Sequence, residues 1–198
     1  MPKKGEQTRR MIVERSLQLF SVKGYYNTSI RDILEATGLT KGGLYGHFAS
    51  KEAVWYAVYE EAVRIWREIV FDGMPGTDDP LGRIDHFIVS DLRSYLGGQV
   101  FAGGCFFLNM LVELSGQSAS MSRQILRGFV QLSRLLQRWL EEAERQRIIR
   151  PGLHHREIAN FIVISLNGAA ALYISSRDRS ILEITVTQLR QYLQQLRL

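Results

Sequence analysis

The sequence predicts an all-α protein, and three observations lead to that prediction. Apolar residues recur at intervals of three and four through most of the 198 residues, which is the spacing of an amphipathic helix. No segment alternates apolar and polar residues as a half-buried strand does. Capping residues and helix-ending residues divide the chain into about nine helical segments.

Three helices are expected first, the last two short and joined by a tight turn at Gly38. Gly24 follows a cation at the end of the first helix, a common helix-ending pattern. Thr28 or Ser29 caps the second helix with its hydroxyl group. The expected ranges are about 6–22, 30–36 and 40–47.

Six longer helices are expected after these three. Ser50 caps the fourth, and Pro80 suits the first position of the fifth, which stops before Gly97. The sixth is expected over 105–115, the seventh begins near residue 118, and the eighth covers about 155–175. Ser180 and Glu183 have the spacing of a capping box, so the ninth helix is expected to start there.

The charge of the chain is concentrated at its beginning. Residues 1–51 contain nine Lys or Arg and four Asp or Glu, whereas the remaining residues contain sixteen of each kind. The net charge of +5 therefore belongs to the first quarter. A basic module attached to a neutral body favours contact with a polyanion, although a solubilising basic tail has the same composition.

Composition also indicates the cellular compartment of the protein. Hydrophobic residues make up 45% of a sequence that has no secretory signal, and its one cysteine, Cys105, cannot form an internal disulfide. The most apolar stretch, 158–174, contains Asn160 and Asn167 and is shorter than a membrane span. We therefore expect a cytoplasmic protein with no membrane partner, in which this stretch is a buried helix.

The segment from Thr28 to Lys51 has the pattern of a helix-turn-helix, a motif that places its second short helix in the major groove of DNA. Glycine at position 38 tolerates the left-handed backbone of the turn. Lys41 can reach a phosphate or a guanine, and the absence of side chains at Gly42 and Gly43 lets the backbone approach DNA. The candidate DNA-binding residues are Thr28, Ser29, Arg31, Thr40, Lys41, Gly42, Gly43, Tyr45, His47 and Lys51. The alternative is that these are ordinary exposed polar residues of a small helical domain.

The run TSIRDILEATGLTKGGLYGHFASKE resembles the signature of TetR-family repressors. Leu34 departs from the pattern, because the family usually has a small residue four positions before the turn glycine. The resemblance implies an all-helical homodimer that dimerises through its last two helices and holds an effector cavity among the middle ones. It also implies a palindromic, double-stranded operator DNA that is released when a small-molecule effector binds.

The resemblance divides the chain into an N-terminal three-helix helix-turn-helix domain, residues 1–50, and a C-terminal helical domain for ligand binding and dimerisation, residues 51–198. The eighth helix supports the homodimer independently, because it is apolar nearly all round and must be covered on both sides. The candidate interface residues are Phe161, Ile164, Gly168, Leu172, Leu189 and Leu193. The alternative is that this helix is the centre of a monomeric core.

Aromatic residues in the middle helices are candidates for an effector pocket, Trp66, Phe107 and Trp139 among them. In the sixth helix, Cys105, Asn109 and Glu113 recur every four residues and share one face. That polar face points into a pocket or, alternatively, is the solvated side of the helix.

Cys105 also follows two glycines at a helix start, where a thiolate is favoured. Redox or electrophile sensing is therefore an alternative hypothesis for the signal, and a buried inert thiol is the opposing one.

Other function classes have little support. The sequence has no G-x-S-x-G, no P-loop and no H-E-x-x-H, and the adjacent His154 and His155 cannot share a helix face as metal ligands do. We therefore expect no enzyme activity, no cofactor and no metal. A purely architectural DNA-binding protein would need basic surface throughout, and the C-terminal three quarters is neutral. A purely protein-binding helical module remains the other alternative.

Overall fold

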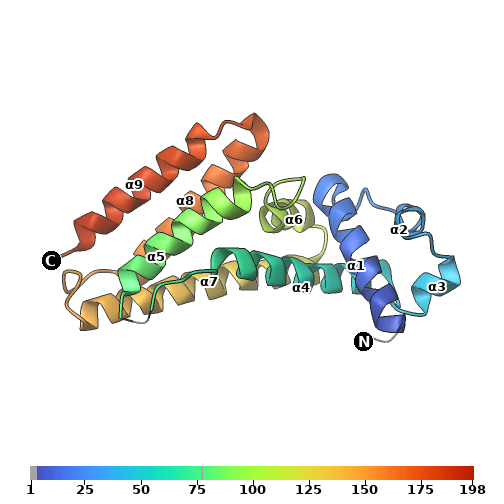
Figure 1. The fold of residues 1–198 in the computed structure, drawn as a ribbon, viewed down its shortest axis with the longest axis horizontal. Helices are drawn as coiled ribbons and strands as arrows, with labels where there is room; N and C mark the ends of the chain where they lie inside the picture. Colours follow the sequence, from blue (N-terminus) through green and yellow to red (C-terminus); the bar gives the residue numbers. More distant parts are fainter. Residues whose placement is uncertain (1–3, 77) are drawn as a thin grey trace.

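The computed structural model describes residues 4–76 and 78–198, and within them the all-α prediction is confirmed (Figure 1). Lys3, one of the lysines of the basic first quarter, lies outside the described residues. The nine α-helices of the described part, with one π-helical segment (η1), are α1 (Lys4–Lys23), α2 (Ile30–Thr37), α3 (Lys41–Tyr45), α4 (Lys51–Val70), α5 (Pro80–Val89), η1 (Ser90–Leu96), α6 (Phe106–Leu114), α7 (Ala119–Arg145), α8 (His155–Ser176) and α9 (Ser180–Leu196).

The first three helices form one end of the molecule, and α4 leads from them into the rest of the chain (Figure 1). α1 packs on both α2 and α4. Their shared core is apolar and includes Phe20, Ile33, Leu44 and Trp55, all of them fully buried. This packing leaves α3 at the far end of the molecule, away from α5 to α9 (Figure 1).

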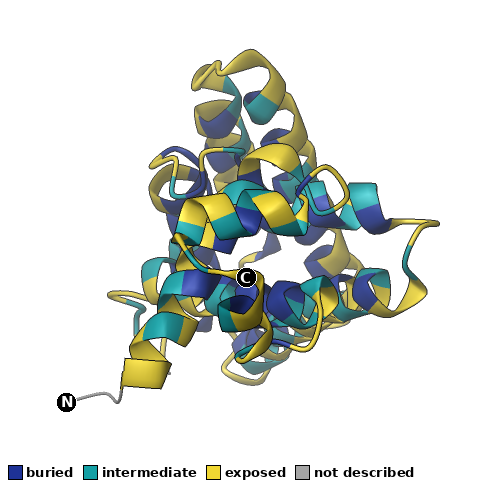
Figure 2. Cartoon of the chain, turned by 90° about the vertical axis from the view of Figure 1, so that its right-hand side faces the viewer, coloured by how far each residue is buried: buried dark blue, intermediate teal, exposed yellow. Residues whose placement is uncertain are grey.

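The remaining helices form a bundle in which α7 packs against α5, α6 and α8, and α9 packs on α8 and α5. Buried residues line the inside of these helices and exposed residues their outside (Figure 2). α8 is 22 residues long, and by length and composition alone it could cross a membrane. α7 and α9 cover one side of α8 within the chain, but its outer face is exposed, so the expectation of a fully buried helix is not met by the single chain.

The fifth helix ends before Gly97 as predicted, but its last part was not anticipated. After Val89 the backbone widens into the π-helix η1, where the N–H of Gly97 donates to the carbonyl of Leu92 at 2.9 Å. A π-helical segment within an α-helix is often found at a functional site. Here it contributes Asp91 and Tyr95 to the inside of the bundle.

The start of the ninth helix differs from its prediction. α9 does begin at Ser180, but the predicted capping box is absent. Asp178 accepts the N–H of Ser180 at 2.9 Å, and Glu183 forms an ion pair with Arg93 of η1. Glu183 therefore joins two helices, because a cation from another part of the chain lies within reach of its carboxylate.

Candidate nucleic-acid interface and internal cavity

Hydrogen bonds within the turns hold the helix-turn-helix in shape. Ser29 caps α2, with its hydroxyl accepting the N–H of Asp32 at 3.1 Å, and Asp32 accepts the N–H of Ser29 at 2.7 Å. Lys23 donates to the other Asp32 oxygen at 2.7 Å. The hydrogen bonds from Lys23 and Ser29 hold the pKa of Asp32 well below its usual value. Gly38 then turns the chain with a φ of +68°, as the glycine pattern predicts.

α3 is shorter than predicted, because it spans only Lys41–Tyr45 and Gly46 ends it. The Thr40 hydroxyl accepts the N–H of Gly43 at 3.2 Å, which fixes the start of the helix. Lys41 and Gly42 are exposed, and Tyr45 is 41% exposed. His47 follows the helix and is half-buried. No heavy atom lies within 4 Å of the position that a Cβ on Gly42 would occupy, so this side of α3 is open.

Two of the candidate DNA contacts point inward instead. Thr28 is fully buried, and its hydroxyl donates to the carbonyl of Gly24 at 2.6 Å. Lys51 donates to the carbonyls of Tyr25 and Thr28, each at 2.9 Å, and its ammonium lies 4.1 Å from the centre of the Tyr25 ring. Burial lowers the pKa of Lys51, an effect that the nearby Glu113 carboxylate opposes. Both predictions of a DNA contact are therefore wrong in orientation, because these side chains satisfy the loop between α1 and α2.

Arg31 stays available on the outer surface of α2. Its side chain is 87% exposed and forms an ion pair with Glu35, one helical turn further on. An exposed pair of this kind contributes little to stability and can open at small cost. Arg31 is therefore exposed and accessible, and its contact with DNA stays a prediction.

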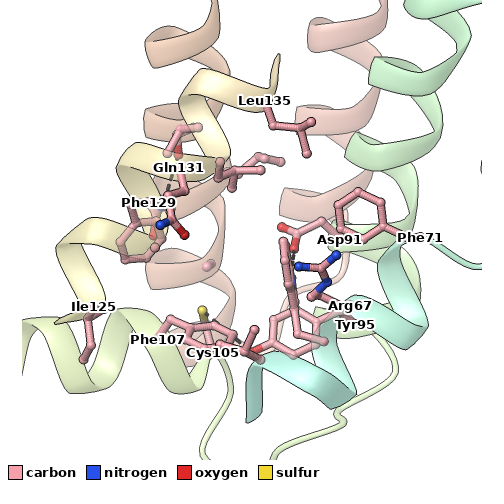
Figure 3. A pocket seen from close by; sticks show the side chains of 18 of the residues that line it. Arg67, Phe71, Asp91, Tyr95, Cys105, Phe107, Ile125, Phe129, Gln131 and Leu135 are labelled. Atoms are coloured by element: carbon pink, nitrogen blue, oxygen red, sulfur yellow. Dashed lines mark hydrogen bonds between the residues drawn. The ribbon is translucent and has the colours of Figure 1, made fainter. Parts of the chain in front are cut away.

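A cavity of about 600 Å³ lies inside the C-terminal bundle (Figure 3). Its walls come from α4, η1, α7 and α8, together with Phe71, Cys105 and Phe107. The predicted aromatic residues Trp66, Phe107 and Trp139 all line it. A volume of this size suits a small organic ligand.

The polar groups of the cavity gather near η1. Trp66 donates its indole N–H to Asp91 at 2.8 Å. Burial raises the pKa of Asp91 to about 6, and the hydrogen bond from Trp66 only partly opposes this effect. The Tyr95 hydroxyl lies 4.0 Å from the sulfur of Cys105. Burial, reinforced by Cys105 and Asp91, raises the pKa of Tyr95 well above its ordinary value.

The surroundings of Cys105 favour the hypothesis of a buried, inert thiol. Cys105 precedes α6 and lines the cavity as expected, but it is only 8% exposed. Burial raises the pKa of its thiol to about 11, which outweighs the backbone N–H groups of the helix start. The thiol is therefore protonated at neutral pH and lacks the thiolate that reacts with oxidants and electrophiles.

The other two residues of the predicted polar stripe on α6 do not line the cavity. Asn109 donates to the carbonyl of Gly103 at 2.8 Å. Glu113 accepts the N–H groups of Tyr25 and Tyr26 at 2.9 and 2.8 Å, which connects α6 to the loop after α1. The prediction that they contact an effector was wrong, because Asn109 binds the loop before α6 and Glu113 binds the loop after α1.

The predicted interface residues separate into two groups. Phe161, Ile164 and Leu172 of α8 are 48%, 68% and 62% exposed, and Gly168 is exposed beside them. Leu189 and Leu193 of α9 are only 3% and 4% exposed, so the prediction of an intermolecular contact is wrong for these two. They pack in the core, and the outward apolar residue of α9 is Ile184.

Several cavity residues escaped the sequence analysis. Arg67, Phe71 and Asp91 line the cavity, as does Tyr95, which belongs to the aromatic candidates of the middle helices. Asp91 stands four positions before Tyr95, one of the aromatic residues of the middle helices, and this spacing is a weak signal of a shared inward face. Nothing in the spacing of Arg67 distinguishes it from the neighbouring exposed arginines. Among the residues that the structure describes, no three His, Cys, Asp or Glu side chains gather into a possible metal site.

Comparison with known proteins gives consistent matches along the chain. Residues 12–58 match the family described as bacterial regulatory proteins, tetR family, and residues 80–189 match the tetracyclin repressor-like C-terminal domain. The HTH-type transcriptional repressor DhaR of Mycobacterium sp. (strain GP1) is 29% identical over 180 residues, which cover 90% of this chain and 88% of that relative.

Solved structures agree with these matches. A TetR transcriptional regulator from Chloroflexus aurantiacus is 30% identical with a TM-score of 0.92, and the match covers 99% of this chain and 98% of that one. A TetR-family regulator from Cytophaga hutchinsonii, 23% identical, shares the fold with a TM-score of 0.85 over 100% of this chain and 98% of that one. The chain therefore belongs to the TetR family of bacterial transcription regulators.

Proposed function

We propose that the chain is a cytoplasmic repressor that binds a palindromic operator as a homodimer and releases it when a small effector enters the cavity. The observation that carries the proposal is the exposed start of α3. Thr40 fixes that start, Lys41 and Tyr45 project from it, and Gly42 leaves it open to close approach. A helix N-terminus with free N–H groups and a lysine suits phosphates and base edges in the major groove.

The proposed DNA-contacting residues are Ser29, Arg31, Thr40, Lys41, Gly42, Gly43, Tyr45 and His47. Lys51 and Thr28 are not among them, because their side chains hold the loop between α1 and α2. Selection from random duplexes with the purified chain is expected to yield an inverted repeat. Fluorescence anisotropy on that duplex is then expected to show weaker binding by Lys41→Ala, and by Tyr45→Phe if the tyrosine hydroxyl contacts DNA. Glu60→Ala is the matched control, because Glu60 is an exposed residue of α4 that does not line the cavity. Wild-type affinity in both α3 variants would contradict this assignment.

The homodimer is supported by the outer face of α8 and α9. Phe161, Ile164, Leu172 and Ile184 are 48–68% exposed, which is unusual for so many large apolar residues on two adjacent helices. A two-fold axis through this face would pack it against the same face of a second copy and bury α8 on both sides. Gly168 adds a position without a side chain where the two copies of α8 can approach.

Analytical ultracentrifugation tests the dimer. Ile164→Asp is expected to shift the protein toward monomer, because it places a charge in the apolar contact. Val22→Asp on α1 is the control, since Val22 is 65% exposed and Ile164 is 68% exposed. An unchanged dimer in Ile164→Asp, or equal dissociation of both variants, would place the interface elsewhere.

The effector site is supported by the cavity of about 600 Å³ and by its contact with α6 through Cys105 and Phe107. Because Glu113 joins α6 to the loop after α1, a ligand that shifts α6 would also shift the two copies of α3 relative to each other. Release follows when the recognition helices no longer match half-sites that lie roughly 34–36 Å apart.

A further inference from the structure

We infer that the effector is an organic anion with an aromatic or similarly flat apolar body. This inference rests on the proposed effector site and names the chemistry that the site would recognise. Two independent features of the cavity support it. One is a continuous wall of aromatic rings, and the other is a set of three arginines that form no ion pair with a carboxylate among the residues that the structure describes.

The aromatic wall is a continuous series of ring contacts among residues that line the cavity or pack beside its lining. Tyr59 meets Phe107 edge to face with 6.0 Å between ring centres, and Phe107 meets Trp66 at 6.2 Å. Trp66 continues to Phe71 at 5.7 Å, and Phe71 to Trp139 at 6.5 Å. A wall of this kind offers ring faces and edges to a flat ligand, which can add to the same edge-to-face pattern.

The charged residues of the cavity are mostly cations. Arg67 from α4 and Arg134 and Arg138 from α7 line it, against a single acid, Asp91. Within residues 4–76 and 78–198, no carboxylate forms an ion pair with any of these three arginines. Arg64, one turn before Arg67, by contrast binds both Glu61 and Glu68. The unpaired guanidinium groups can therefore donate to an anionic ligand without first breaking an ion pair.

Asp91 does not make the cavity a cation site. Its carboxyl already accepts the indole N–H of Trp66 at 2.8 Å, and burial raises its pKa to about 6. Even when Asp91 is ionised, the three arginines of the lining leave the cavity with a net positive charge. Figure 3 shows Asp91 and Arg67 extending from the same side of the cavity, with the aromatic rings beside them.

Calorimetric titration of the purified full chain at pH 7 tests the inference with three probes of nearly equal shape. These probes are 2-naphthalenesulfonate, the neutral 2-naphthalenesulfonamide, and the cationic 2-naphthylmethylammonium. The sulfonate is expected to bind at least roughly tenfold more tightly than the sulfonamide, because it gains charge-assisted hydrogen bonds from the arginines. Equal affinity of sulfonate and sulfonamide, tighter binding of the ammonium, or binding of none of them would overturn the inference.

Three variants locate the effect. Arg134→Gln with Arg138→Gln is expected to reduce the preference for the sulfonate to about threefold or less, since one guanidinium of three remains. Arg127→Gln is the matched control, because Arg127 is also exposed on α7 but does not line the cavity. Leu135→Trp places a large ring in the cavity and is expected to abolish binding of the sulfonate and of the sulfonamide. An unchanged preference in the double variant, or unchanged binding in Leu135→Trp, would contradict the assignment.

Operator binding by the same preparations separates this inference from the proposed function. Chains that bind a palindromic duplex normally but show no preference for the sulfonate would refute the anionic effector and leave the repressor proposal standing. Chains that prefer the sulfonate but bind no duplex would support the anionic ligand and refute the repressor proposal.

Discussion

The backbone N–H of Tyr25 donates to the Glu113 carboxylate at 2.9 Å, which ties the loop after α1 to a helix 88 positions further along the chain. The second carboxylate oxygen accepts the N–H of Tyr26 at 2.8 Å. The fit is close, because a Cβ on Gly24 would lie 2.7 Å from the same oxygens. α6 thus contacts the helix-turn-helix through Glu113 and the cavity through Phe107.

Removing this contact is expected to destabilise the protein. Glu113→Ala loses two hydrogen bonds to a charged group, and we expect the free energy of unfolding to fall by about 1–3 kcal/mol. Glu113→Gln keeps one acceptor oxygen, so its free energy of unfolding should lie between those of Glu113→Ala and the wild type. Urea denaturation measures both, with the exposed Glu60→Ala as control. Equal stability of Glu113→Ala and Glu60→Ala would mean that the two hydrogen bonds contribute nothing.

Lys41 and Lys51 are expected to respond to substitution in opposite ways. Lys41 is exposed at the start of α3. Lys41→Ala should therefore make the negative slope of log affinity against log salt less steep by about one, and it should leave stability unchanged. Lys51 holds two loop carbonyls, so Lys51→Met should lower the free energy of unfolding by about 1–3 kcal/mol. Anisotropy at several salt concentrations and urea denaturation distinguish the two effects. A reversed pattern would assign the phosphate contact to Lys51.

Gly42→Ala is expected to separate stability from DNA binding. Alanine favours a helix over glycine by about 1 kcal/mol, and the added methyl group meets no atom of the protein. The variant should therefore unfold at higher urea concentration. It should also bind the operator roughly tenfold more weakly, because the methyl group lies where DNA approaches. Tighter or unchanged operator binding would show that this side of α3 does not face DNA.

Asp91 is expected to make stability depend on pH. Its pKa is about 6 in the folded protein and 3.8 in its ordinary state, so the folded protein keeps this proton to higher pH than the unfolded chain. The free energy of unfolding should therefore fall as pH rises from about 4 to about 6, by at most roughly 3 kcal/mol. Asp91→Asn should remove that dependence, and the exposed Asp72→Asn should keep it. Parallel pH profiles of wild type and Asp91→Asn would contradict the raised pKa.

Cys105 is expected to react slowly in the folded protein. Because burial raises the pKa of its thiol to about 11, little thiolate exists at pH 8. Labelling with 5,5′-dithiobis(2-nitrobenzoate) should be at least roughly a hundredfold slower than for a small free thiol, and urea should restore a normal rate. Rapid labelling without urea would revive the hypothesis of an electrophile sensor.

Local patterns in the sequence predicted the helices well, since caps and spacing act over a few residues. Gly38 and Ser29 behave as their types suggest, and α8 has the expected extent. The prediction of domain boundaries at residue 50 stays a prediction. The widening of the backbone at η1 left no signal, because its residues are ordinary helix formers.

Side-chain partners distant in the chain were the part that the sequence could not predict. Glu113 and Asn109 share a face as expected, but which neighbour covers that face depends on how α6 packs on the loop after α1. Leu189 and Leu193 share an apolar stripe that either a second copy of the chain or the protein's own core could cover. The packing of α9 on α8 shows that the core covers it. Lys51 was expected to be exposed because it is charged. In the structure its ammonium group instead donates to two backbone carbonyls more than twenty positions earlier in the chain.

Footprinting on the duplex recovered by selection tests the central claim most directly, because it reports the DNA site and its symmetry in one measurement. We expect two protected half-sites related by a two-fold axis, with centres one helical turn or a multiple of it apart and with protection that weakens as salt increases. Protection of a single asymmetric stretch, or uniform protection with no preference over competitor DNA at low salt, would contradict a dimer that reads DNA with two copies of α3.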